Sequence, residues 1–164
     1  NAEHVGIAGV NGSGKTTLLT ALMRMVPDDL STLFIPQEIG SELAARIMAS
    51  LHEASPGERG RVLSIVAQLN SDPDRILDGD ELSPGELRKL MLAQGILRHP
   101  VLIAMDEPTN HLDVGSIEAL ERVLVAYPGA LVLVSHDEHL LEKTTDFRWC
   151  LESGDGSAYV LRTA

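Results

Sequence analysis

The chain has 164 residues, 44% of them hydrophobic, and its 13 Lys and Arg face 24 Asp and Glu, which gives a net charge of −11. This length and apolar content are those expected of one soluble domain with a sizeable core. The acidic balance disfavours functions that need a broad basic face for nucleic-acid backbones or anionic lipids, although it leaves room for local basic sites.

Cysteine usage and apolar stretches indicate the compartment. Cys150 is the single cysteine, so neither an internal disulfide nor a cysteine metal cluster can form, and a reducing cytoplasm is expected. The longest strongly apolar stretches, 101–105 and 130–134, are far shorter than the roughly 20 residues of a membrane span. We therefore expect no direct membrane insertion. The first residue is Asn1 rather than Met, which suggests a piece of a longer polypeptide.

The chain begins with an alternation of strand and helix. Its apolar residues predict a strand over 5–8, a helix over 15–26 that Pro27 ends, and a second short strand over 33–36. Glycines separate the first strand from the helix. The order is therefore strand, glycine loop, helix, strand.

The middle of the chain changes character. Apolar stripes at helical spacing predict helices over 41–54 and 59–69, with no strand between them and a polar turn around Pro73 after them. This region is expected to close near Gly79. We interpret it as a helical subdomain, at about 38–81, inserted into a nucleotide-binding core.

Alternation returns in the second half, so the core is expected to comprise residues 1–37 and 82–164. Apolar strands separated by helices predict the α/β class, with a mostly parallel sheet covered on both faces. The expected elements of this half are a helix over 84–97, a buried strand over 101–105, a helix over 116–126, a strand over 130–134, a short helix over 137–143, and a hairpin of 147–151 and 158–161 around Gly154, Asp155 and Gly156.

Residues 9–16 read Gly-Val-Asn-Gly-Ser-Gly-Lys-Thr, the spacing of a P-loop, and lie between the first strand and the first helix. Glycines let successive backbone N–H groups surround phosphate oxygens, and the helix directs its positive end at the same charge. Lys15 is expected to reach the outer phosphates of ATP, and the Thr16 hydroxyl to bind Mg²⁺. A glycine turn without a ligand is the alternative. The predicted nucleotide-binding residues are Gly9, Asn11, Gly12, Ser13, Gly14, Lys15, Thr16 and Thr17.

An acidic pair, Asp106 and Glu107, follows the strand over 101–105. In P-loop enzymes such a strand delivers an acid to the rim of the sheet, so Asp106 is predicted to hold Mg²⁺ and Glu107 to act as base for the attacking water. In isolation the pair would be a solvated loop. The P-loop upstream in the same chain favours the functional interpretation.

Residues 83–86 read Ser-Pro-Gly-Glu and fit a capping box, with Ser83 as the N-cap and Glu86 at the third helical position. The cap is sufficient reason for these residues to open a helix. A capped helix N-terminus is also an anion site, so a structural and a functional interpretation hold together.

With these motifs in order, almost the whole chain resembles an ATP-binding cassette (ABC) domain. Residues 82–86, Leu-Ser-Pro-Gly-Glu, are similar to the family's Leu-Ser-Gly-Gly-Gln signature. The resemblance implies that Gln37 senses Mg²⁺ and the attacking water, and that His136 contacts the γ-phosphate. A metal site at His136 and His139 is the alternative, but no third ligand is in view. The resemblance also implies that the signature residues Ser83, Gly85 and Glu86 serve the nucleotide of an opposite cassette.

The residues of the later motifs narrow the resemblance to one subfamily. Residues 106–113 read Asp-Glu-Pro-Thr-Asn-His-Leu-Asp, and with 116–120 and 135–137 they resemble the F subfamily, whose members carry two cassettes on one chain, lack transmembrane domains and act on ribosomes. Transporter cassettes more often read Ser-Ala-Leu-Asp at 110–113. The interval between Gln37 and Ser83 has no extended arm insertion, which favours the second cassette.

Three departures from the family pattern stand out. Only eight residues precede Gly9, so the upstream antiparallel strands and the aromatic residue that stacks on adenine are missing from this sequence. Pro84 replaces a glycine and has no N–H to donate to a phosphate. Glu86 replaces a glutamine and adds a negative charge near a phosphate site.

The resemblance therefore implies Mg-ATP binding and hydrolysis by a pair of cassettes that acts as a switch on the ribosome, in translation regulation or antibiotic resistance. The alternatives are the ATP-hydrolysing subunit of an ABC membrane transporter and a nucleotide clamp without turnover. The partner is a second cassette, on the same parent chain or in a homodimer of isolated chains. Hydrolysis by one isolated chain is expected to be weak or absent. Because this piece is acidic, ribosome contacts are expected in regions outside it.

Overall fold

A computed structural model describes residues 2–78, 82–153 and 159–163. The chain divides into two compact units, one formed by residues 1–37, 100–109 and 121–164 and the other by 38–99 and 110–120. The predicted end of the helical region near Gly79 and the predicted hairpin turn at Gly154, Asp155 and Gly156 lie outside the described residues.

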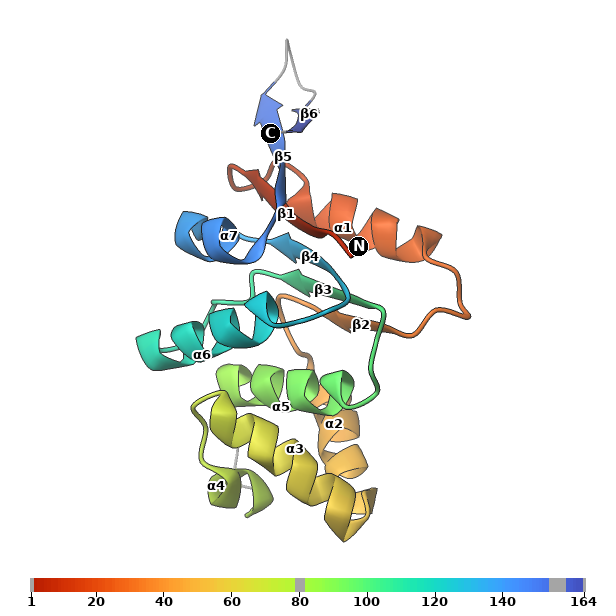
Figure 1. Ribbon diagram of the computed structural model, residues 1–164, viewed down its shortest axis with the longest axis vertical. Helices are drawn as coiled ribbons and strands as arrows, with labels where there is room; N and C mark the ends of the chain where they lie inside the picture. Colours follow the sequence, from red (N-terminus) through yellow and green to blue (C-terminus); the bar gives the residue numbers. More distant parts are fainter. Residues whose placement is uncertain (1, 79–81, 154–158, 164) are drawn as a thin grey trace. The chain divides into compact units, whose positions relative to one another are not determined.

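The first unit holds a six-stranded sheet in the order β2-β3-β4-β1-β5-β6 (Figure 1). Every neighbouring pair is parallel except the last, β5 and β6, which is antiparallel. The prediction of an α/β fold with a mostly parallel sheet is therefore confirmed. The strands are β1 (His4–Gly9), β2 (Thr32–Ile35), β3 (Leu102–Asp106), β4 (Ala130–Val134), β5 (Phe147–Ser153) and β6 (Tyr159–Thr163).

Helices α1 (Lys15–Met25) and α7 (Glu138–Thr144) cover opposite faces of this sheet (Figure 1). Ile7 of β1 is fully buried in one cluster with Leu19 of α1. Its neighbour Gly6 lies against α7, because a Cβ on Gly6 would come within 3.0 Å of the Leu141 side chain. Successive residues of a strand point to opposite faces, so the two helices sandwich β1 between them.

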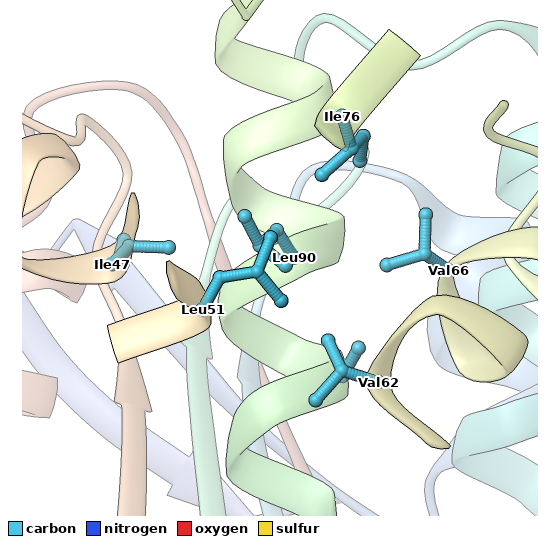
Figure 2. Packing of buried hydrophobic residues seen from close by; sticks show 7 residues of the cluster. Ile47, Leu51, Val62, Val66, Ile76 and Leu90 are labelled. Atoms are coloured by element: carbon cyan, nitrogen blue, oxygen red, sulfur yellow. The ribbon is translucent and has the colours of Figure 1, made fainter. Parts of the chain in front are cut away.

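The second unit contains α2 (Ser41–Glu53), α3 (Pro56–Gln68), α4 (Pro73–Leu77) and α5 (Pro84–Ile96). Helix α6 (Val114–Val125) contributes its first seven residues to this unit and the rest to the first. Figure 2 shows the packing at the centre of the second unit, where side chains from four helices meet. The buried residues of this cluster are Ile47, Leu51, Val62, Val66, Ile76, Leu90 and Ala93.

The division of the chain differs from the predicted one on one side. The second unit begins at Glu38, at the predicted position, but it extends to His99 and takes in residues 110–120. The expected core of 1–37 and 82–164 thus assigns α5 to the wrong unit. The physical reason is that Leu90 and Ala93 of α5 are fully buried among the side chains of α2, α3 and α4.

Local capping explains the starts of two helices that differ from expectation. Helix α3 begins at Pro56, three residues before the predicted start, because Ser55 and Glu58 form a capping box. The predicted polar turn after it contains the start of α4. There the Asp72 side chain accepts from the Asp74 N–H, and Pro73 occupies the first helical position.

Candidate functional site

The catalytic and nucleotide-binding residues predicted for the core follow four neighbouring parallel strands of the first unit. The P-loop begins at Gly9, the last residue of β1, while Gln37, Glu107 and His136 come just after β2, β3 and β4. The carboxyl ends of parallel strands meet at one edge of a sheet, where α/β proteins bind their ligands. The sheet order β2-β3-β4-β1 thus places these residues along one edge.

A cavity of about 420 Å³ lies at the P-loop. Inside the loop the Ser13 hydroxyl is buried and has no hydrogen-bond partner among the described residues. Buried polar atoms in folded proteins nearly always have a partner, so an unpaired hydroxyl here fits a loop built to receive a polar ligand. The residues that line the cavity are Asn11, Gly12, Gly14, Lys15, Thr16, Thr17, Gln37 and Glu107.

The backbone of the loop requires glycine at two positions. Gly12 has a φ of 79° and Gly14 a φ of 91°, a region that residues with a Cβ rarely adopt. A Cβ at either position would meet no atom within 4 Å, so space is not the constraint. The glycines are needed for backbone conformation, of the kind in which successive N–H groups of a loop can surround an anion.

Lys15 lies inside the loop rather than in solvent. Its residue is 7% exposed, and its Nζ donates to the carbonyl oxygens of Gly9 at 2.8 Å and Val10 at 3.2 Å. An ammonium group has three donors, so one remains for a ligand in the cavity. The side chain therefore places a positive charge beside the glycine-rich turn.

Glu107 and His136 contact each other. The Glu107 Oε2 accepts from the His136 backbone N–H at 3.3 Å and lies 2.7 Å from Nδ1 of the ring. Glu107 is buried and has a φ of 47°, which is unusual for a residue with a side chain. Such conformations cost about 1–3 kcal/mol and persist where the surrounding structure imposes them, often at functional sites. The carboxylate is thus oriented by a neighbour and lines the P-loop cavity.

The predicted Mg²⁺ ligands have suitable chemistry. Thr16, Gln37 and Asp106 offer a hydroxyl, an amide and a carboxylate oxygen, the ligand types that this hard cation prefers. Thr16 and Gln37 line the cavity, whereas Asp106, 1% exposed at the end of β3, does not. Within the described part of the chain, no group of three or more His, Cys, Asp or Glu could hold a metal ion. The Nε2 of His139, the second histidine of the alternative metal site, lies 3.9 Å from Oε1 of Glu121.

The predicted signature residues lie in the second unit, at the start of α5. Ser83 caps the helix by accepting from the Glu86 N–H at 3.2 Å, and Glu86 Oε2 accepts from the Ser83 N–H at 2.8 Å and hydroxyl at 2.7 Å. Gly85 is buried, and a Cβ there would lie 2.6 Å from the His111 carbonyl oxygen. Only glycine fits at this position without a shift of the backbone. The capping-box prediction is confirmed.

A second cavity, of about 370 Å³, lies at this turn. Sequence reasoning did not identify the basic residues that line it, Arg75 and Lys89. A charged residue between the buried positions of α5 is the signal that could have found Lys89. Its Nζ donates to Asn70 O at 3.1 Å, Ser71 Oγ at 3.0 Å and Ser116 Oγ at 2.6 Å, and burial lowers the pKa of this amine.

The Glu86 carboxyl is held as a carboxylate. Burial by itself would raise its pKa, but the two hydrogen bonds from Ser83 and the charges of Arg75 and Lys89 outweigh that effect, so the pKa lies below its ordinary value of 4.5. Hydrogen bonds likewise lower the pKa of Glu58 in the capping box of α3, and the Ser116 N–H and hydroxyl lower that of Asp113.

An acid titration should therefore destabilise the second unit. A carboxyl whose pKa is lower in the folded state contributes stability above its unfolded pKa and loses it as pH falls through the folded value. We expect the free energy of unfolding to fall as the pH drops below about 4.5, measured by urea unfolding followed by circular dichroism. Glu86→Gln should flatten this fall relative to a control, Glu42→Gln, in an exposed side chain. Equal slopes for both variants would contradict the assignment.

The Ser-Pro-Gly-Glu turn occurs twice in the chain, which sequence reasoning also missed. The first copy is residues 55–58 and the second is residues 83–86, and each opens a helix with a capping box. At the first copy, however, a Cβ on Gly57 would meet no atom within 4 Å, and Glu58 is exposed. Capping alone therefore does not account for the closed surroundings of the second copy.

Comparison with known proteins identifies relatives of this chain. The family model described as "ABC transporter" matches residues 1–110. Ribosome protection protein VmlR of Bacillus subtilis is 35% identical over 89% of this chain and 28% of its own length. Tylosin resistance ATP-binding protein TlrC of Streptomyces fradiae is 32% identical over 93% of this chain and 30% of its own length. A solved structure described as a model of ribosome-bound archaeal Pelota and ABCE1 has a TM-score of 0.70 at 25% identity, over 98% of this chain and 30% of that one.

The chain thus spans less than a third of the length of these relatives. Among the described residues, no helix is long and apolar enough to cross a membrane.

Proposed function

Because this chain belongs to the ATP-binding cassette family, as an ABC ATPase domain of the kind found in the F subfamily, we propose that it binds Mg-ATP in the P-loop cavity and hydrolyses it in a site that a second cassette completes. The observation that carries the proposal is Glu107, a buried carboxylate on strained backbone that His136 orients and that shares the cavity with Lys15 and Gln37. This is the arrangement expected of a general base beside a phosphate-binding loop.

Each residue has a distinct part in this mechanism. The N–H groups of the P-loop and the Lys15 ammonium hold the β- and γ-phosphates of ATP, and Gln37 orients the attacking water. Glu107 accepts a proton from that water as the water oxygen bonds to the γ-phosphorus, and the bond from the γ-phosphorus to the bridging oxygen of the β-phosphate breaks, so that ADP and inorganic phosphate are the products. His136 keeps the carboxylate in place and faces the γ-phosphate. Thr16, Gln37 and Asp106 would hold Mg²⁺, which would supply positive charge to the phosphate oxygens.

The signature turn supports the sharing of the site between two cassettes. Ser83 and Gly85 belong to the second unit, and their cavity has no lining residue in common with the P-loop cavity. In the ABC family the signature serves the opposite cassette. Mg-ATP would therefore lie between the P-loop of one cassette and the Ser-Pro-Gly-Glu turn of the other, and hydrolysis would let the pair separate.

We further propose that the parent protein is a cytoplasmic protein with two cassettes, that this chain is its second cassette, and that it acts on the ribosome in translation regulation or antibiotic resistance. The names of the relatives, a ribosome protection protein and a tylosin resistance protein, support this use. A transporter subunit is the second candidate, which the description of the family model supports. A charged linker and another cassette in the parent sequence would favour the ribosome; a gene for a membrane domain beside it would favour transport.

The two copies of the turn provide a matched test of the shared site. Ser55→Ala and Ser83→Ala each remove a capping hydroxyl, so each should lower the free energy of unfolding by about 0.5–2 kcal/mol. Only Ser83→Ala should also weaken Mg-ATP-driven pairing of the chain, measured by light scattering on the Glu107→Gln background. If both variants paired equally well, Ser83 would be a helix cap and nothing more.

A further inference from the structure

The two Ser-Pro-Gly-Glu turns differ most in the cations around their glutamates. At the first turn the positive charge of Arg61 helps to lower the pKa of Glu58, but that carboxylate is exposed. At the second turn the Glu86 side chain is only 13% exposed, and Arg75 Nε lies 3.5 Å from its Oε1. Arg75 comes from α4, eleven residues before Glu86 in the sequence, so the fold brings it to this turn.

The donors of the two cations in the second cavity are used differently. All three N–H donors of Lys89 are taken by Asn70, Ser71 and Ser116. Lys89 therefore contributes charge but has no donor left for a ligand. Arg75 has five N–H donors, its side chain is 57% exposed, and its ion pair with Glu86 engages one of them. Of these two cations, Arg75 is the one that can donate to an incoming oxyanion.

The charge balance of the cavity favours a role for this donor. Two cations line the cavity, together with three carboxylates, which are Asp72, Glu86 and Asp113. Each carboxylate already accepts hydrogen bonds, Asp72 from the Asp74 N–H and Asp113 from Ser116 and Asn70. A phosphate that approached the turn away from Arg75 would meet uncompensated negative charge.

We propose that Arg75 is a phosphate-binding residue of the signature site: it neutralises Glu86 and donates directly to the terminal phosphate of the nucleotide that the partner cassette holds. This inference rests on the proposed function, because it assigns one more residue to the shared site. It also accounts for the glutamate of this signature, whose negative charge Arg75 offsets. The ligand class is a polyphosphate with a free terminal phosphate group, bound by a planar guanidinium that suits such groups.

The first experiment needs no pairing. Inorganic triphosphate is titrated into the Lys15→Ala chain, whose own P-loop is weakened, and the amide resonances of Ser83, Gly85 and Glu86 are followed by NMR. Arg75→Gln should weaken the triphosphate affinity measured from these resonances by about 10- to 100-fold, the loss expected for a charge-assisted hydrogen bond. Arg61→Gln, the matched change beside the first turn, should leave it unchanged. Equal titrations for Arg75→Gln and Arg61→Gln would overturn the proposal.

The second experiment separates direct contact from charge compensation. On the Glu107→Gln background with Mg-ATP, Arg75→Gln should weaken pairing by a similar factor, without changing nucleotide affinity of the monomer in calorimetry. The double variant Arg75→Gln/Glu86→Gln should stay weak, because the donor is still missing. Full recovery of pairing in the double variant would show that Arg75 only neutralises Glu86, and would overturn direct contact.

The two measurements also distinguish this inference from the proposed function. A chain that fails to pair with Mg-ATP, yet shows the Arg75-dependent triphosphate response, would count against the shared ATPase site and support the phosphate contact. If the Arg75→Gln chain paired normally with Mg-ATP, the result would support the shared ATPase site and count against the phosphate contact of Arg75.

Discussion

Replacing Glu107 with Gln is expected to slow ATP hydrolysis by about 10²- to 10⁴-fold while nucleotide binding is retained. The amide keeps the shape of the side chain but cannot accept a proton from the attacking water. Glu107 lines the cavity beside Lys15, so the change removes the proposed base and leaves the proposed phosphate ligands in place. Phosphate release measures hydrolysis, and calorimetry with Mg-ATP measures binding.

The control for this variant is Glu3→Gln, which changes the charge of the same unit by the same amount at an exposed position. It should hydrolyse ATP at the parent rate. If Glu107→Gln hydrolysed ATP as fast as Glu3→Gln, another group would have to be the base. If it lost binding as well, the carboxylate would serve the fold of the cavity rather than the chemical step.

Lys15→Ala is expected to remove most of the affinity for Mg-ATP. The ammonium is the cation that lies within the P-loop, and it is already fixed there by the carbonyl oxygens of Gly9 and Val10. Charge-assisted hydrogen bonds contribute about 1.5–3 kcal/mol each, so the loss of even one contact to the outer phosphates predicts at least a roughly tenfold weaker affinity. Calorimetry with Mg-ATP measures it.

The comparison for Lys15→Ala is Arg24→Ala, in the last turn of the same helix and exposed to solvent. Arg24→Ala should bind as the parent chain does. Because Lys15 also bonds the loop itself, thermal unfolding of both variants is needed to show that the fold survives. Unchanged affinity in a folded Lys15→Ala chain would contradict the assignment of the P-loop lysine.

The strands and the P-loop could be predicted from the sequence because their signals are local. The run 130–134 is short, apolar and preceded by Pro128 and Gly129, a pattern typical of a buried strand, and the order strand, glycine loop, helix fixes where Lys15 and Thr16 lie relative to β1. Glu107 and His136 follow neighbouring strands, so their meeting depends only on the order of the sheet.

What the sequence did not reveal depends on contacts between distant residues. Arg75 reaches Glu86, and Lys89 joins α5 to Asn70 and Ser116, through tertiary packing that no periodicity records. The prediction placed α5 in the core, whereas it lies in the helical unit, for the same reason: its apolar stripe is compatible with either unit until its neighbours are known. The strained φ of Glu107 likewise has no signature in the local sequence.

The most direct test of a site shared between two cassettes is a mixing experiment with two inactive variants. In a mixed pair, the P-loop of the Ser83→Ala copy meets the intact signature turn of the Lys15→Ala copy, so one complete site forms. Hydrolysis by an equal mixture at high protein concentration should therefore exceed the mean of the two variants measured separately. A mixture whose rate equalled that mean, with both variants folded and the parent chain active, would contradict the shared site.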